Sequence, residues 1–526
     1  MLGKQNRQTS FLDMESWFDD PIVDPDSIYG LMAKWGTQLI REEDFSELYS
    51  ATGRPSVSPG LLAKVLLLMY HDNVSDREAE QRAKYDLRWK WALRLPMNES
   101  GFDFTAICRF RARLLTSKQQ RLVFTRFVTL AHEAGIVKGN SLQIIDSTHV
   151  LGAAAVQDTY TLIKTAIRKL LHISHRKNGP AKQAFDRLTL SLDYSKKDKD
   201  DIHWEDKAAR QKLLNQLVTD GRTLRQAIEA EPEMELSEEE KTALEMLSTI
   251  TEQDIEEIAS GEVAIKQGVA KDRIISAHDP EMRHGHKTSK GRFNGHKVQV
   301  MTDEASEIIT HIGVTPGNEA DGDALPEMLQ QSTVKPQILL GDTAYGTLAA
   351  RDTMESQNVV PVAPLPMGSK KAGHFGKHEF VIDFSRNSCR CPAGEVTTRV
   401  RKKGDQISAY VFLPKTCNRC ELRDQCTKHG TGRVIGVHPE EERRRLIIKQ
   451  TETEEFKTFY RRRAKCERKN AHLIRKGMRK SRYLGKAKTL LQVAFTAAAV
   501  NLKRLCTIAK GNLCTLQRLE TCMANG

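Results

Sequence analysis

The chain has 526 residues, more than one compact core usually holds, so we expect two or more domains or one core with large insertions. Hydrophobic residues make up 39% and charged residues 28%, as in globular proteins. No stretch is apolar enough for a membrane span, and the N-terminus MLGKQNRQTS lacks the apolar core of a signal peptide. These features argue against a membrane or secreted protein and predict a cytosolic one.

The formal net charge of +13 is concentrated in one segment. Residues 457–488 contain 14 Lys or Arg and a single acid, Glu467, so the rest of the chain is close to neutral. A solvated basic face is one interpretation of such a run. Concentration at one place favours a polyanionic partner.

Residues 25–135 are expected to be helical. The run 59–70 has Pro near its start and apolar residues on all sides, which predicts a buried helix. A capping box at 75–78 opens a second helix, and Asp103 or Thr105 can cap a third. The third helix carries arginines at alternate positions: Arg109, Arg111 and Arg113. Two interpretations compete, a helix-turn-helix DNA reader and a plain helical bundle with solvated arginines.

Apolar runs of strand length begin after residue 140 and predict an α/β core with a mixed sheet. The expected strands are 141–146, 295–301, 307–314, 336–340 and 359–362, of which the second and third form a hairpin. The expected helices of this core are 323–331 and 348–357. Residues 158–269 interrupt the core with a polar helical segment that has an acidic middle and a capping box at Ser237, and we interpret them as an inserted subdomain.

Two carboxylates each follow an apolar strand, Asp146 in IIDSTHV and Asp342 in QILLGDTAYG. If the strands are neighbours, the carboxylates converge, and a divalent cation is the usual way to hold both ionised. Glu467 is the third candidate. It is expected on an inward helical stripe made of Tyr460, Ala464, Glu467, Ala471, Ile474 and Met478. A salt bridge from Glu467 to a neighbouring arginine is the alternative to metal binding.

These three acidic motifs resemble those of the DDE transposases of bacterial insertion sequences, whose catalytic domain is ribonuclease-H-like. YRRRAKCE resembles the Tyr-x2-Arg-x3-Glu signature of that family through Tyr460, Arg463 and Glu467. The lysine that often follows is replaced by Ile474, and Arg475 or Lys476 is the candidate substitute. The N-terminal stretches ATGRPSVSPGLLAKVLLLMY and GFDFTAICRFRARL also resemble the helical N-terminal domain of these transposases.

The resemblance implies a transposase that binds the terminal repeats of its element, cleaves the DNA ends and transfers 3′-hydroxyl strands to target DNA. It implies two Mg²⁺ (or Mn²⁺) ions held by Asp146, Asp342 and Glu467, with Asp146 bridging them. His149 is expected to be structural. We also expect a homodimer in the bacterial cytoplasm, associated with the nucleoid. The candidate DNA-binding residues are Arg109, Arg111, Arg113, Tyr460, Arg461, Arg463, Arg468, Lys469, Arg475 and Lys476.

Two other functions remain open at this point, a metal-dependent DNA nuclease without strand transfer and a catalytically inactive DNA-binding protein. The intact set of three acids argues against the inactive protein. A strand-transfer assay separates the transposase from the nuclease.

Five of the ten cysteines fall within 38 residues. Cys391, Cys417, Cys420 and Cys426 form a four-thiolate set with a Cys-x2-Cys-x5-Cys core, and Cys389 is spare. Such clustering in a cytosolic chain predicts a metal rather than disulfides, with structural zinc as the default. The spacing also resembles the iron–sulfur site of RecB-like nucleases, and unligated thiols are a third possibility.

The expected fold class is α/β, a ribonuclease-H-like mixed sheet core with a helical N-terminal DNA-binding domain and two insertions. The expected boundaries are 1–135 for the helical domain, 136–157 and 270–368 for the catalytic core, 158–269 for the helical insertion, 369–440 for the cysteine-rich insertion, 441–510 for the basic helices that complete the core, and 511–526 for a tail.

Overall fold

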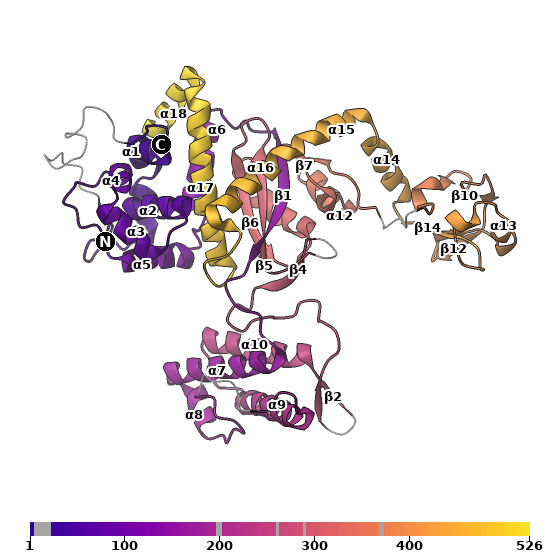
Figure 1. The fold of residues 1–526 in the computed structure, drawn as a ribbon, viewed down its shortest axis with the longest axis horizontal. Helices are drawn as coiled ribbons and strands as arrows, with labels where there is room; N and C mark the ends of the chain where they lie inside the picture. The colour runs from indigo at the N-terminus through magenta and orange to yellow at the C-terminus, as the bar shows by residue number, and fades with distance from the viewer. Residues whose placement is uncertain (5–22, 196–201, 259–261, 288–290, 368–372, 526) are drawn as a thin grey trace. The chain divides into compact units, whose positions relative to one another are not determined.

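A computed structural model of the chain describes residues 1–4, 23–195, 202–258, 262–287, 291–367 and 373–525 (Figure 1). The chain divides into two compact units. The first consists of Met1–Pro336 and Lys465–Gly526, and the second of Gln337–Ala464. None of the helices in the described residues combines the length and apolar character that a bilayer crossing requires.

The first unit begins with a bundle of helices. Its members are α1 (Ile28–Leu39), α2 (Pro59–Asp72), α3 (Asp76–Tyr85), α4 (Leu87–Leu93), α5 (Phe104–Thr116) and α6 (Leu122–Glu133). Every residue of α2 from Pro59 to Tyr70 is buried, as its all-round apolar sequence predicts. The side chains of Ser75 and Asp103 cap α3 and α5, which confirms these two predicted helix starts.

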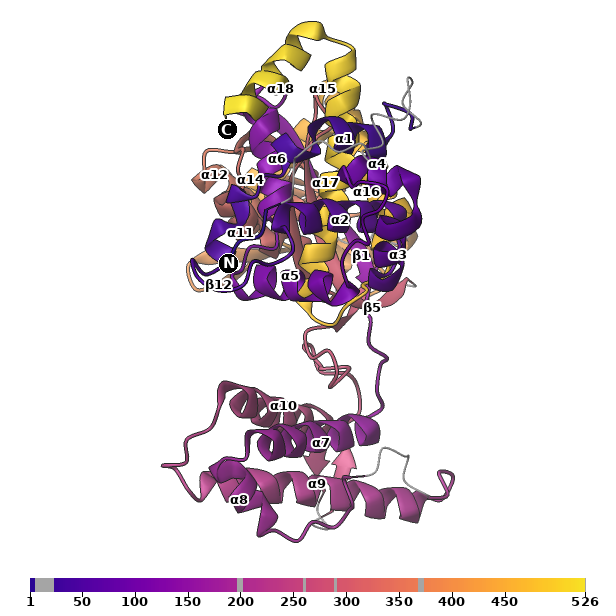
Figure 2. The ribbon, with the colours of Figure 1, turned by 90° about the vertical axis from the view of Figure 1, so that its left-hand side faces the viewer.

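The C-terminal helices complete this bundle. Helix α17 (Lys486–Lys510) packs against α2 and α6, and α18 (Leu513–Asn525) packs against α17 and α6. Figure 2 shows α17 running among the N-terminal helices. Residues 494–499 of α17, AFTAAA, are all buried, because small side chains allow close approach of the neighbouring helices. The two ends of the chain therefore share one core.

Antiparallel strands form the sheet of the first unit. Strand β5 (Arg292–Asp303) pairs with β1 (Ser141–Leu151) on one edge and with β4 (Arg283–His286) and β6 (Ile309–Pro316) on the other. The β5–β6 hairpin confirms the predicted hairpin. Strand β1 is longer than expected, because DSTHVL keeps pairing with β5 beyond Asp146. The prediction that Asp146 ends its strand is therefore wrong, and Asp146 lies in the middle of β1 opposite Val300.

The described residues of the segment predicted as an insertion form four helices with a hydrophobic core of their own. They are α7 (Thr159–Lys177), α8 (Pro180–Asp186), α9 (Lys207–Glu229) and α10 (Glu238–Asp254), followed by the ribbon of β2 (Ile255–Glu257) and β3 (Val263–Ile265). Buried residues of this core include Leu170, Leu217 and Ile250. The predicted capping box is present, with Ser237 and Glu240 each accepting from the other's backbone.

The connection to the second unit follows β6. It contains the 3₁₀ turn η3 (Asp321–Ala324) and helix α11 (Leu325–Gln331), close to the predicted helix. The second unit then opens with β7 (Pro336–Leu340), the 3₁₀ turn η4 (Thr343–Tyr345), α12 (Leu348–Ser356) and β8 (Val360–Val362). Strands β7 and β8 are parallel. Antiparallel and parallel strand pairs combined with helices confirm the α/β class.

The remainder of the second unit is a small cysteine-rich module, residues 373–437, followed by helices. One sheet contains β9 (Val381–Asp383), β10 (Ser388–Arg390) and β11 (Val396–Thr397), and another contains β12 (Val400–Lys403), β13 (Gln406–Val411) and β14 (Val434–Gly436). Phe380, Tyr410, Phe412 and Ile435 form its core. The second unit also contains three helices, α13 (Pro414–Asn418), α14 (Glu441–Thr451) and α15 (Glu454–Tyr460). Its 3₁₀ turns in this part are η5 (Lys377–Glu379), η6 (Arg423–Gln425) and η7 (Arg461–Arg463).

Candidate active site

Helix α16 (Ala464–Leu473) lies against β1 and β5 at the position of Asp146. The Asn470 side-chain amide donates to Oδ2 of Asp146 over 3.0 Å. One turn earlier, the Cys466 thiol lies 3.8 Å from the carbonyl oxygen of Val300, the residue opposite Asp146. The helix that carries Glu467 is therefore anchored at the aspartate of the first acidic motif.

The two faces of β1 have different environments. Successive side chains of a strand alternate, so Ser147 and His149 lie on the face opposite Asp146. The ring centroid of His149 lies 5.0 Å from that of Phe293, with the two rings tilted by 33°. The Nε2 atom of His149 lies 2.8 Å from the Arg479 guanidinium. Burial and the positive charge of Arg479 lower the pKa of His149. These contacts agree with a structural role for His149.

Glu467 is exposed, and its predicted place on an inward stripe is wrong. The buried residues of α16 are Cys466, Lys469, Asn470 and Leu473. The predicted stripe took Ala464 and Ala471 as apolar neighbours of Glu467, but both alanines are exposed, because alanine fits an exposed helix face as well as a buried one. A further segment, η8 (Ile474–Met478), contains Gly477 at φ 89° and kinks the chain after α16. The carboxylate of Glu467 consequently carries little desolvation cost.

Asn470 is a buried polar residue beside Asp146. Its side chain is buried, and its Oδ1 has no hydrogen-bond partner among the described residues. A buried acceptor without a partner costs about 1–3 kcal/mol. This oxygen belongs to the same side-chain amide that donates to Asp146. Sequence reasoning missed Asn470, although a polar residue one turn after Glu467 was a visible signal.

Asp342 lies in the second unit, directly after β7 and Gly341. Its Oδ1 accepts from the Ala344 backbone over 2.9 Å and caps η4. Gly346 ends the motif because a Cβ there would meet the Pro364 carbonyl oxygen at 1.8 Å. The position of Asp342 after the strand is as predicted, and Gly346 allows the tight turn that presents it.

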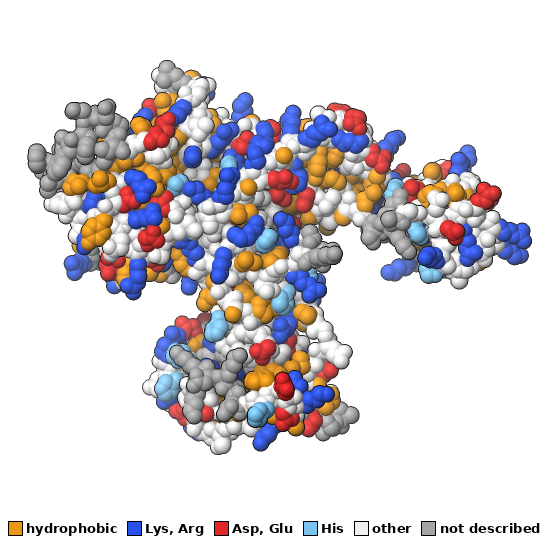
Figure 3. Space-filling view, in the orientation of Figure 1, with side chains coloured by type: hydrophobic (Ala, Val, Ile, Leu, Met, Phe, Trp, Pro, Cys, Tyr) orange, Lys and Arg blue, Asp and Glu red, His pale blue; other side chains and the backbone are white. Residues whose placement is uncertain are grey.

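Among the basic residues, Lys469 is not available to DNA. It is 3% exposed, its ammonium lies 3.2 Å from Glu307, and burial lowers its pKa. Arg468 also contacts Glu307, at 3.1 Å, but stays exposed. Arg461 and Arg475 are exposed, whereas Tyr460 and Arg463 are half-buried. The ammonium of Lys476 donates a hydrogen bond to the His71 carbonyl oxygen. Figure 3 shows Lys and Arg side chains over α15 and α16.

Arg111 lies on a different face of α5 from Arg109 and Arg113, because residues four apart share a helix face and residues two apart do not. Arg111 is paired with Asp76 and donates to the Tyr483 hydroxyl over 2.9 Å, so neither the DNA-contact nor the solvated-face interpretation holds for it. Arg113 donates to the Leu48 carbonyl oxygen and lies over Tyr49. Arg109 is exposed, and among the described residues it has no side-chain hydrogen bond or ring contact like those of Arg111 and Arg113.

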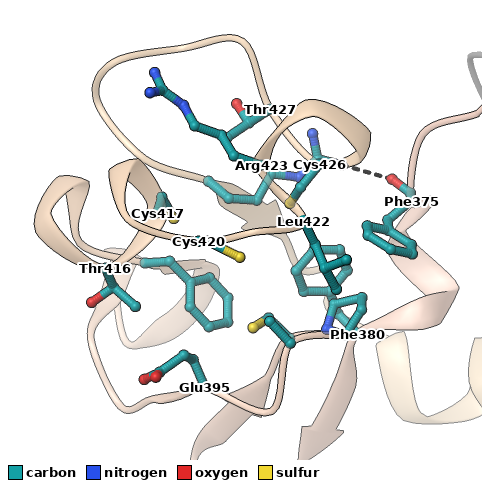
Figure 4. Close-up of a pocket in the computed structure, with 15 residues that line it drawn as sticks. Phe375, Phe380, Glu395, Thr416, Cys417, Cys420, Leu422, Arg423, Cys426 and Thr427 are labelled. Carbon is teal, nitrogen blue, oxygen red and sulfur yellow. Dashed lines mark hydrogen bonds between the residues drawn. The ribbon is translucent and has the colours of Figure 1, made fainter.

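The four predicted cysteines line one small pocket of about 30 Å³, together with Phe380 and Phe412 (Figure 4). Backbone turns present them, since Gly394 donates to the Cys391 carbonyl oxygen and Cys420 to that of Cys417. Cys389 lies in the apolar core instead. Burial raises the pKa of Cys426, and the neighbouring thiols add to the effect. Across the described residues, no three His, Cys, Asp or Glu side chains are arranged so that they could hold a metal ion.

Comparison with known protein families gave two matches. Residues 390–506 match the transposase DDE domain, and residues 20–113 match the Transposase domain (DUF772). The first match spans Glu467, Asn470 and the cysteine pocket, and the second spans α1 to α4 and most of α5. Searches among curated proteins and among solved structures found no match. The two matches, in different parts of one chain, support a DDE transposase of an insertion element.

Proposed function

We propose that this transposase binds the terminal repeats of its element, cleaves the DNA at the ends and transfers the 3′-hydroxyl strands to target DNA. Asp146, Asp342 and Glu467 are the proposed catalytic residues. The observation that carries the proposal is the hydrogen bond from Asn470 to Asp146, which joins the first acidic motif to the helix of the third. A ribonuclease-H-like core is proposed on the same basis, supported by the β1, β5 and β6 strands.

Divalent Mg²⁺ or Mn²⁺, two ions per site, would activate the attacking hydroxyl and stabilise the leaving oxygen. Asp146 and Glu467 offer the hard carboxylate oxygens that such ions prefer. Asp146 is held in place by Asn470, and exposed Glu467 is accessible to a DNA strand. Asp342 is proposed as the third ligand from its place in the GDTAYG turn.

DNA contacts are proposed for the exposed basic residues Arg109, Arg461, Arg468 and Arg475 and for half-buried Arg463 and Tyr460 next to Glu467. The helical N-terminal domain is the proposed binder of the terminal repeats. Two ends must be cut and joined together, which supports a homodimer as the working form.

We also propose a structural Zn²⁺ at Cys391, Cys417, Cys420 and Cys426, with an iron–sulfur cluster as the alternative. The shared pocket and the two backbone turns support this site. The thiols would have to draw together around the ion. Coordination would then link the Cys391 turn to the Cys417–Cys426 segment and stabilise a module with a core of only six buried residues.

The proposed function is tested by incubating the protein with duplex DNA that carries the element's ends, in Mg²⁺, and resolving the products on a denaturing gel. Cleavage at the ends together with joined strand-transfer products is the expected result. Cleavage without joined products would instead favour a nuclease. Binding without cleavage would favour an inactive DNA-binding protein.

A further inference from the structure

A groove of about 870 Å³ lies within the second unit, between α14 and the cysteine-rich module. Figure 1 shows α14 beside the strands of this module. Six Lys or Arg and three His line the groove, against two Glu. They are Lys377, Lys428, Arg433, Arg444, Arg445, Lys449, His374, His378, His429, Glu441 and Glu452.

Part of this set holds the walls of the groove together. Glu441 is buried and accepts from Lys377 of the module and from Arg445 one turn along α14. Arg445 also donates to the Phe380 carbonyl oxygen over 2.8 Å. Arg433 donates to the Phe375 carbonyl oxygen over 3.2 Å. One of the two acids is therefore already neutralised by structural contacts.

The outer basic residues have a different environment. Lys428 and Lys449 are exposed and Arg444 is half-buried. Among the described residues, none of the three has an ion pair with a carboxylate. Arg444 and Lys449 come from α14, whereas Lys428 comes from the loop that follows Cys426. Three cations that make no ion pair among the described residues thus line one groove from two sides.

We infer that this groove binds the phosphate backbone of duplex DNA. This inference rests on the proposed function, which makes DNA the substrate, and adds a binding surface outside the three acidic motifs. Guanidinium and ammonium groups bind phosphate oxygens without reading bases, so the binding is independent of sequence. The groove is much larger than one phosphate ion, and its cations approach from both walls, which suits a continuous polyanion.

The cysteine pocket and the groove share a wall, since Phe375, Cys426, Thr427 and Arg433 line both. Lys428 directly follows Cys426 and Thr427 in the sequence. The conformation of the Cys417–Cys426 segment therefore determines where Lys428 lies. This gives the cysteine-rich module a role in DNA binding as well as in stability.

The test compares the full chain with a triple variant, Lys428→Gln, Arg444→Gln and Lys449→Gln. A matched control removes three exposed cations from β12 of the same module, Arg401→Gln, Lys402→Gln and Lys403→Gln, none of which lines the groove. Binding of fluorescent duplexes is measured by anisotropy without divalent metal, over a range of salt. One duplex carries the element's ends, and the other has an unrelated sequence. Circular dichroism checks that each variant is folded.

The groove variant is expected to bind both duplexes about tenfold or more weaker at 0.1 M salt, with the log–log salt slope smaller by about 0.9 per lost phosphate contact. The control should keep the affinity and slope of the unchanged protein. Equal affinity and slope in the groove variant, in a protein that still cleaves element ends, would overturn this inference and leave the proposed function standing. Absence of both DNA binding and cleavage in the unchanged protein would overturn both.

Discussion

Asn470 makes the direct contact between the helix of the third acidic motif and Asp146. Its amide fixes one carboxylate oxygen, while its own Oδ1 has no partner among the described residues. A group that orients a metal-binding carboxylate typically affects activity by about 10–100-fold. The contact therefore makes Asn470 a positioning residue for Asp146.

We expect Asn470→Ala to lower the single-turnover cleavage rate of end-bearing DNA by about 10–100-fold, with DNA affinity retained. The Mg²⁺ concentration for half-maximal cleavage should rise, which a purely structural role would not produce. His472→Ala, an exposed position of the same helix, is the control. Wild-type cleavage and Mg²⁺ dependence in Asn470→Ala would show that this contact has no part in the chemistry.

The cysteine pocket gives a second prediction at the level of single side chains. Cys420→Ser should lose the bound metal and lower the melting temperature, because one of four ligands is removed. Cys514→Ser, an exposed cysteine of α18, should behave like the unchanged protein. Elemental analysis gives the metal, and a brown colour with broad visible absorbance would identify an iron–sulfur cluster rather than zinc. If folded, active protein contained neither zinc nor iron, the proposed metal site at the four cysteines would be ruled out.

Among the secondary-structure elements, the N-terminal helices meet at Asp72, the last residue of α2. Its carboxylate accepts from Tyr29 of α1, Arg82 of α3 and Trp89 of α4, at 2.8–2.9 Å. Burial alone would raise the pKa of Asp72, but the hydrogen bonds from His71, Trp89 and Tyr29 outweigh it and lower the pKa to about 2. One side chain thus links four helices.

Because this pKa is depressed, the stabilisation exists above the ordinary carboxyl pKa near 4 and is lost as the pH falls toward 2. We expect Asp72→Asn to reduce the free energy of unfolding by about 2 kcal/mol or more at pH 7. The difference from the unchanged protein should shrink below pH ~4. Glu78→Gln removes an exposed partner of the same Arg82 and should cost less than about 1 kcal/mol. A pH-independent difference in urea unfolding would contradict this account.

The elements that sequence predicted well are defined by local signals. The apolar run of α2, the hairpin of β5 and β6 and the capping box of α10 each depend on neighbouring residues. The length of β1 was underestimated because polar residues after Asp146 are held by pairing with β5, which no local pattern reveals.

At the candidate site, the choice of the three acids stays a prediction, and the sequence did not predict their surroundings. The buried face of α16 could not be derived because two of its residues, Lys469 and Asn470, are polar and are held inside by Glu307 and Asp146. The Arg111 side chain is held inside the protein by hydrogen bonds to Asp76 and to Tyr483, and Tyr483 is more than 370 residues away in the sequence. In both places, tertiary contacts override a periodic pattern.

In the molecule as a whole, the basic segment 457–488 is less of a DNA surface than its charge implies. Lys465, Arg468 and Lys469 contact Glu304 and Glu307 at the β5–β6 turn, and so hold α16 on the sheet. Part of the positive charge therefore serves the fold of the first unit. The basic groove of the second unit lies entirely outside this segment and supplies further positive surface.

We propose Asp146, Asp342 and Glu467 as the catalytic residues, although they come from different parts of the chain. The most direct test measures cleavage of end-bearing duplex DNA in Mg²⁺ by Asp146→Asn, Asp342→Asn and Glu467→Gln, each nearly isosteric, with DNA affinity measured in parallel. Asp352→Asn, an exposed carboxylate of α12, serves as the control. The account predicts that each of the three variants binds DNA with nearly unchanged affinity and that cleavage falls to background, while the control cleaves normally. Near-normal cleavage by any one of the three would contradict the claim.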